Sequence, residues 1–85
     1  MKKHTMVYVD VGYSYPTRIA VIKNDVLHEV LELSPATEFQ EIIDRIVDLL
    51  MMHKISGDLV KCHGFPAIER SVYKIVGPRK DYEAK

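Results

Sequence analysis

The chain has 85 residues, with twelve basic and twelve acidic side chains and a formal net charge of zero. A chain of this length buries roughly 60–65% of its unfolded surface, enough for one hydrophobic core, so we expect a single domain over residues 1–85. The 47% apolar and 28% charged composition excludes a disordered or fibrous chain, and the balanced charge counts against a general nucleic-acid binder.

The sequence predicts neither a membrane segment nor an export signal. No apolar run reaches the ~18–20 residues needed to span a bilayer, and Met1-Lys2-Lys3 leads into a predicted strand rather than into the apolar segment of a signal peptide. A single cysteine, Cys62, excludes an intramolecular disulfide framework and is typical of a reducing compartment. We therefore expect a cytoplasmic protein with no membrane segment.

Three strands are predicted over roughly residues 6–33, as one antiparallel unit. Residues 7–11 alternate between valine and polar side chains, which places Asp10 near a strand end, just before Gly12 lets the backbone turn. A second strand begins after Pro16, and Lys23-Asn24-Asp25 predicts a compact turn with left-handed backbone angles. The third strand, residues 26–33, has an imperfect period of two, since Glu29 shares the parity of three leucines.

A helix is predicted over roughly residues 36–55. Ser34 can cap its start, Pro35 suits the first helical position, and Thr37 with Gln40 offers a second capping box. Apolar residues recur at helical spacing and form one stripe, made of Phe39, Ile42, Ile43, Ile46, Val47 and Leu50. We expect the helix to end at Lys54 or Ile55, with Gly57 in the left-handed conformation that terminates it.

The rest of the chain predicts a fourth strand over residues 58–63, broken by Gly64-Phe65-Pro66. Residues 66–76 fit either a short helix or another strand, and residues 78–85 form a charged tail. A right-handed crossover through the helix would place the fourth strand parallel to the first, beside Asp10. The predicted core comprises Val7, Val9, Ile19, Val21, Leu31, Phe39, Ile42, Ile43, Ile46, Leu50, Leu59 and Val60. The fold class is therefore α/β (α+β), with the order β-β-β-α-β and a mixed sheet.

The run Asp10-Val11-Gly12-Tyr13-Ser14-Tyr15-Pro16-Thr17, with the strand that returns after it, resembles the first hairpin of the RNase H-like superfamily. Within that superfamily it looks most like the nuclease domain of the large terminase subunits that cut and package phage DNA. Residues 29–32 resemble the third strand of that domain, and residues 57–60 resemble the entry to its fourth. The resemblance implies the first half of an RNase H-like domain, with Asp10 as a metal ligand.

The sequence departs from this family at the fourth strand, where the family carries its second acid. Cys62 or His63 stands at that place, although Pro66 and Ile68 approximately keep the pattern that follows. The family's third acid comes from a later helix, which we do not expect from a chain of this length. We therefore expect a nuclease-derived binding module without cleavage activity, which engages a protein or a nucleic acid.

The alternative is an endonuclease that depends on Mg²⁺ or Mn²⁺, with Asp10 as the principal ligand and Glu38 or His63 assisting. Two-metal nucleases need several carboxylates that converge on the ions, and one aspartate does not suffice. Asp10 could equally cap the turn at residues 12–14. A histidine at the position of His63 is more often half-buried and hydrogen-bonded to a backbone carbonyl than it is a metal ligand. Glu41 points away from the helical stripe, so Glu38 is the better candidate for a ligand from the helix.

The remaining candidates concern binding. Cys62 has no zinc-ligand spacing, and no general base or oxyanion site can be argued for it as a nucleophile, so we expect a small buried apolar side chain. Tyr13 and Tyr15 are expected to be exposed at the first turn, where they could stack on a partner. Apolar residues exceed what one helix can cover, namely Met51, Met52, Ile55, Phe65 and Val76. This excess predicts a homodimer or a heterologous partner.

Overall fold

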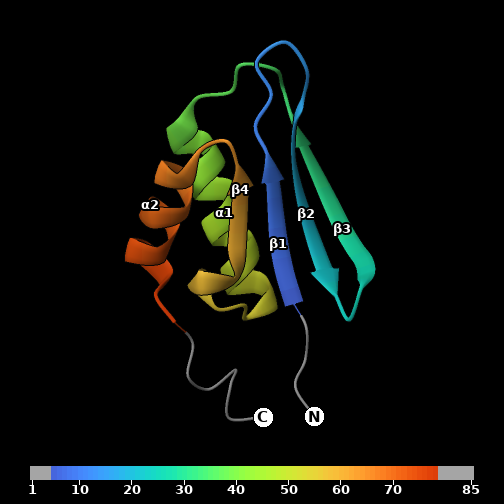
Figure 1. The fold of residues 1–85 in the computed structure, drawn as a ribbon, viewed down its shortest axis with the longest axis vertical. Coiled ribbons are helices and arrows are strands. Elements are labelled where there is room, and N and C mark those ends of the chain that lie inside the picture. Colours follow the sequence, from blue (N-terminus) through green and yellow to red (C-terminus); the bar gives the residue numbers. More distant parts are fainter. Residues whose placement is uncertain (1–4, 79–85) are drawn as a thin grey trace.

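A computed structural model of the chain describes residues 5–78. It is a mixed α+β fold in which one four-stranded sheet is combined with two helices (Figure 1). In chain order the elements are β1 (Thr5–Asp10), β2 (Thr17–Lys23), β3 (Val26–Leu33), α1 (Phe39–His53), a 3₁₀ turn η1 (Gly57–Leu59), β4 (Val60–His63) and α2 (Pro66–Val76). The predicted order β-β-β-α-β is confirmed. The predicted charged tail lies almost entirely outside the described residues.

The strands lie in the order β3-β2-β1-β4. The first three strands are antiparallel neighbours, and β4 runs parallel to β1 with Asp10 opposite His63. The prediction that the fourth strand lies parallel to and beside the first is therefore confirmed. Since β1 and β4 point the same way, their carboxyl ends meet at one end of the sheet, at the top of Figure 1.

The imperfect period of the third strand has a structural cause. The pairing of β2 with β3 shifts by one residue, so that Val21 faces Glu29 while Ile22 faces Leu27. His28 is the extra residue of this β-bulge, and the parity of the strand changes there. The turn before β3 has positive φ at Asn24 and Asp25, as predicted.

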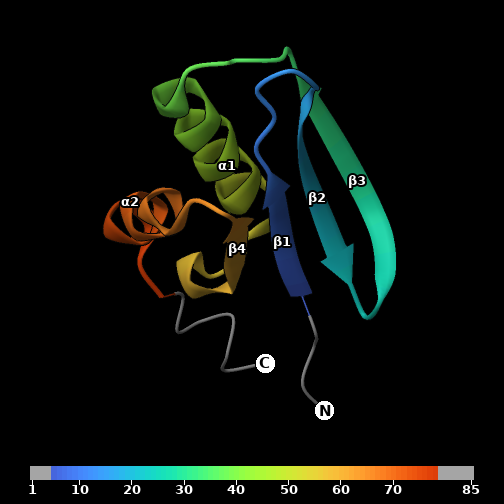
Figure 2. The ribbon, with the colours of Figure 1, turned by 45° about the horizontal axis from the view of Figure 1, so that its top comes forward.

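Both helices lie on the same side of the sheet (Figure 2). The strand residues beneath them are buried and alternate with exposed ones, which is the period of a sheet covered on one face. The surface opposite the helices is called the open face below. Nine of the twelve predicted core residues are buried, and Leu31 and Leu59 are half-buried. The prediction that Phe39 is a core residue is wrong, because Phe39 is 46% exposed at the first turn of α1.

The core also contains residues that helical or strand periodicity did not select: Leu33, Leu49, Ile55, Cys62, Ile68 and Val72. Ile68 and Val72 come from α2, whose conformation the sequence left open. Proline is favourable at the start of a helix, because the backbone N–H that it lacks would have no partner within the helix there. The i,i+4 spacing of Ile68 and Val72 places both side chains on one face, so α2 buries both. Ile55 is fully buried just after α1, so it does not belong to the apolar surface that was predicted to contact a partner.

The ends of α1 differ from the prediction. The helix begins at Phe39 with Glu38 as its N-cap residue, and residues 34–37 form a separate turn in which Thr37 bonds the carbonyl of Ser34. At the other end Lys54, and not Gly57, adopts the left-handed conformation, with φ 56°. The reason is that Ile55 must turn back into the core, which forces the reversal at the residue directly before it. Neither helix in residues 5–78 is long and apolar enough to cross a membrane.

Candidate functional site

Asp10 and His63 lie side by side on the open face, at the carboxyl ends of β1 and β4. They are the last residues of the two parallel strands and face each other in the register. Both side chains are exposed, so the prediction of a half-buried His63 is wrong. The cause is parity, because His63 alternates with the buried Cys62 and therefore points away from the helices.

A charged row crosses the open face at this end of the sheet, formed by Glu32, Arg18, Asp10 and His63. The register places them on neighbouring strands in that order, from β3 to β4. Arg18 donates from Nε to Oε2 of Glu32 at 2.8 Å, and both side chains are exposed. Exposed ion pairs stabilise a fold by at most about 1 kcal/mol, so this row contributes mainly its pattern of charge.

The first turn is held by Thr17 and not by Asp10. The N–H of Gly12 donates to Oγ1 of Thr17 at 2.9 Å, and this hydrogen bond is buried. The carbonyl of Gly12 accepts from the N–H of Ala36 at 3.2 Å, which ties the turn to the segment before α1. Asp10 is therefore not required for capping the turn.

An aromatic hollow of about 470 Å³ opens beside this turn, on the helix side of the sheet end. Its walls come from three segments, the first turn, the start of α1 and the start of α2. The lining residues are Val11, Gly12, Tyr13, Ala36, Thr37, Glu38, Phe39 and Phe65. Phe39 and Phe65 meet edge to face with ring centroids 5.0 Å apart. Tyr13 is 85% exposed at its rim, and Tyr15 is also exposed, as predicted.

The three proposed ligand residues are divided between these two places. Asp10 and His63 are neighbours on the open face, whereas Glu38 lines the aromatic hollow at the start of α1. Within residues 5–78 no three side chains of histidine, cysteine, aspartate or glutamate gather closely enough to hold a metal ion. A two-metal site needs several carboxylates around both ions, and Asp10 with His63 offers only one. The described residues therefore do not fit such a centre.

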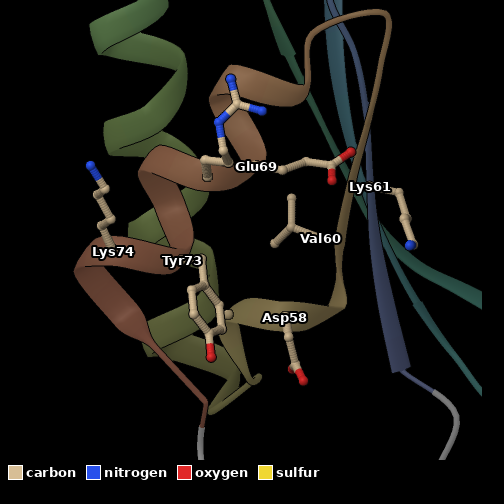
Figure 3. A pocket seen from close by; sticks show the side chains of 8 residues that line it. Asp58, Val60, Lys61, Glu69, Tyr73 and Lys74 are labelled. Carbon is tan, nitrogen blue, oxygen red and sulfur yellow. The ribbon is translucent and has the colours of Figure 1, made fainter.

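A second groove, of about 400 Å³, runs between β4 and α2 (Figure 3). Val60 points into it from β4, and the ring of Tyr73 borders it on the α2 side near Asp58. Lys61 and Lys74 extend away from it on opposite sides. Glu69 spans the groove and accepts a hydrogen bond from the backbone N–H of Cys62 at 2.7 Å. This carboxylate occupies a backbone donor that another strand would need for pairing with β4.

Cys62 is buried beneath the helices, as predicted. Its burial, together with the negative charges of Glu69 and Asp10, raises the pKa of the thiol from 9.0 to about 11. The thiol is therefore protonated at neutral pH, and the thiolate is the form that attacks carbon or binds zinc. Cys62 is a core residue rather than a reactive one.

The raised pKa predicts a loss of stability at alkaline pH. Between roughly pH 9 and 11 the unfolded chain releases the thiol proton and the folded chain keeps it, so the free energy of unfolding falls as pH rises. A shift of about two pKa units corresponds to about 2–3 kcal/mol at most. Urea unfolding at pH 8 and pH 11 should show this fall in the wild type and a smaller fall in Cys62→Ala. Equal falls in both proteins would contradict the assignment.

Comparison of the chain with protein-family models, with curated proteins and with solved structures gave no match. The resemblance of the first turn to RNase H-like proteins therefore stays a prediction from the sequence.

Sequence reasoning missed the partners of the predicted residues. Arg18 and Glu32 join the charged row only because β2 and β3 bring them beside Asp10, although their position in the hairpin could have indicated this pairing. Phe39 and Phe65 lie 26 positions apart and meet only in the folded chain. The hydrogen bond from the backbone N–H of Cys62 to Glu69 depends on the conformation of residues 66–76, which the sequence left undecided.

Proposed function

We propose that this chain is a nuclease-derived, RNase H-like binding module, which holds an apolar side chain of a protein partner in the aromatic hollow. The observation that carries the proposal is the hollow itself, because Tyr13, Phe39 and Phe65 gather there from three separate segments. Its volume is within the range of about 300–1,000 Å³ typical of ligand sites. Aromatic side chains at such places supply most of the energy of many protein interfaces.

The charge of the hollow favours a protein over a nucleic acid. Its lining contains one charged side chain, Glu38, and no lysine or arginine. Nucleic-acid binding depends on cations that neutralise phosphates, and an acidic rim opposes it. The resemblance of the first turn to RNase H-like proteins and the strand order β3-β2-β1-β4 support the proposed descent. The cytoplasmic location stays a prediction.

A capture experiment tests the proposal. The immobilised wild type should retain a specific protein from a nuclease-treated lysate of the native host, and Tyr13→Ala should lose it. Truncation of an anchoring tyrosine typically costs about 2 kcal/mol, or roughly a 30-fold weaker Kd. That fold-change should be measured by calorimetry with the purified partner.

The matched control is Tyr73→Ala, which removes an exposed tyrosine from the groove beside β4 and should bind like the wild type. Equal loss in both variants would argue against the aromatic hollow. Retention that disappears after nuclease treatment would indicate a nucleic-acid partner and overturn the choice of a protein.

The second candidate, a Mg²⁺- or Mn²⁺-dependent endonuclease, is favoured by one observation. Asp10 and His63 stand together at the carboxyl ends of parallel strands, which is where open α/β sheets commonly bind ligands. We expect no metal-dependent cleavage of single- or double-stranded DNA or RNA above background, and no difference between the wild type and Asp10→Asn. Cleavage by the wild type that is lost in Asp10→Asn would establish the enzyme instead.

A further inference from the structure

The open face of the sheet is apolar over its lower two-thirds. Along one row Val30, Ala20 and Tyr8 are neighbours on β3, β2 and β1, with Lys61 at the end on β4. The row below it contains Leu27, Ile22 and Met6. Tyr8 is 47% and Leu27 59% exposed, and both helices pack on the opposite face. Contiguous apolar surface of this kind marks an interaction site.

The charged row above these apolar rows alternates between acidic and basic side chains. From β3 to β4 it contains an acid, a base, an acid and a histidine, which are Glu32, Arg18, Asp10 and His63. When a second copy of this row faces the first in the reverse order, each acidic side chain lies opposite a basic one. A two-fold axis that runs parallel to the strands, between β1 and β2, reverses the row and keeps each row opposite its counterpart. This symmetry brings Arg18 of one copy against Asp10 of the other, twice.

From this pattern we propose that a second copy of the chain covers the open face and forms a two-fold face-to-face dimer. The same axis that pairs Arg18 with Asp10 also places Tyr8 opposite Ala20 of the second copy, so that a large side chain meets a small one. Sheets that pack face to face lie about 10 Å apart with their strands within about 30° of one another. Because each sheet is twisted, the corners of the two sheets lie farther apart than their centres. The contacts nearest the axis therefore contribute most of the binding energy.

The two edges of the sheet offer poorer surfaces for a second copy. At β4, Glu69 already binds the N–H of Cys62. At β3, the bulge at His28 interrupts the regular ladder that another strand would follow. Neither obstacle affects the open face. The dimer uses a surface other than the aromatic hollow and does not depend on the proposed function.

The size of the face sets the expected affinity. Four strands spaced about 4.8 Å apart, and rows that extend from Met6 to Asp10, give a surface of roughly 15–20 Å in each direction. This is smaller than the roughly 800 Å² per partner of a standard stable interface and falls in the range of weak, transient contacts. We therefore expect a reversible dimer with a Kd in the micromolar range or weaker, visible by sedimentation velocity between roughly 10 and 500 µM protein.

Two single charge reversals test the geometry. Arg18→Glu places two acids against each other at both central contacts, and Asp10→Arg places two bases there. Each variant alone should dimerise at least tenfold more weakly than the wild type, since like charges in contact cost several kcal/mol. An equimolar mixture of the two should recover dimers, because both contacts then join opposite charges. The two positions are exposed, so both variants should fold, and circular dichroism should be used to check this.

Tyr8→Ala provides a variant without a charge change and should weaken the dimer about tenfold or more. Tyr73→Ala, on the α2 side, should leave dimerisation unchanged. A wild type that stays monomeric over the whole concentration range overturns the proposal. So does a dimer that tolerates both charge reversals, and so does a mixture of weakened variants that fails to recover.

Discussion

Replacement of Leu50 by alanine is expected to lower the free energy of unfolding by about 2–5 kcal/mol, the range for truncating a fully buried leucine. Leu50 lies on the core side of α1 with no exposed surface. The loss combines the transfer of the removed carbon atoms to water with the cavity that remains. A domain of this length has a total stability of roughly 4–13 kcal/mol, so this one substitution removes a large part of it.

Met51→Ala is the matched control, because Met51 is the next residue of the same helix and is 58% exposed. Alanine is favourable in helices, and surface substitutions usually stay within about 0.5 kcal/mol. Urea unfolding of both variants, followed by circular dichroism, gives the comparison. Similar losses for Leu50→Ala and Met51→Ala would mean that α1 does not present the face described here to the sheet.

The second large effect is expected from Gly12→Ala, with a loss of about 1–3 kcal/mol from overpacking. A β-carbon on Gly12 would overlap the backbone carbonyl oxygen of Tyr15 and lie 2.6 Å from Cδ1 of its ring. The backbone oxygen cannot move aside without opening the turn that Thr17 and Ala36 hold. The turn must then open or shift, and Tyr13 moves with it.

Gly64→Asn is the control for this effect. Gly64 has φ +81° with no atom within 4 Å of an added β-carbon, and asparagine tolerates positive φ better than most residues. We expect a change of about 0.5 kcal/mol or less for this surface substitution. Thermal unfolding should place Gly12→Ala well below the wild type and Gly64→Asn near it. The reverse order would show that the close approach of Tyr15 to Gly12 is not required for folding.

Local patterns of the sequence were sufficient for the first three strands and for the topology. The predicted start of the fourth strand was wrong, because residues 58–59 lie in the 3₁₀ turn η1 and β4 begins at Val60. Alternation followed by Gly12 predicts that β1 ends near Asp10, and Asn24-Asp25 supplies the left-handed angles that join β2 to β3. The crossover rule then makes β4 parallel to β1, because a short chain can return to the sheet through α1 in few ways. These features depend on neighbours within a few residues or on general constraints of chain connection.

Only the tertiary structure decided where the helices end and which side chains meet. α1 ends at His53, where its Nε2 lies 2.9 Å from Oε1 of Glu29 on β3, a contact that no local pattern contains. Residues 66–76 are helical because Ile68 and Val72 find a core to enter. The charged row and the aromatic hollow assemble residues from separate elements. Both depend on the register and packing of elements far apart in the sequence, which periodicity within one segment does not encode.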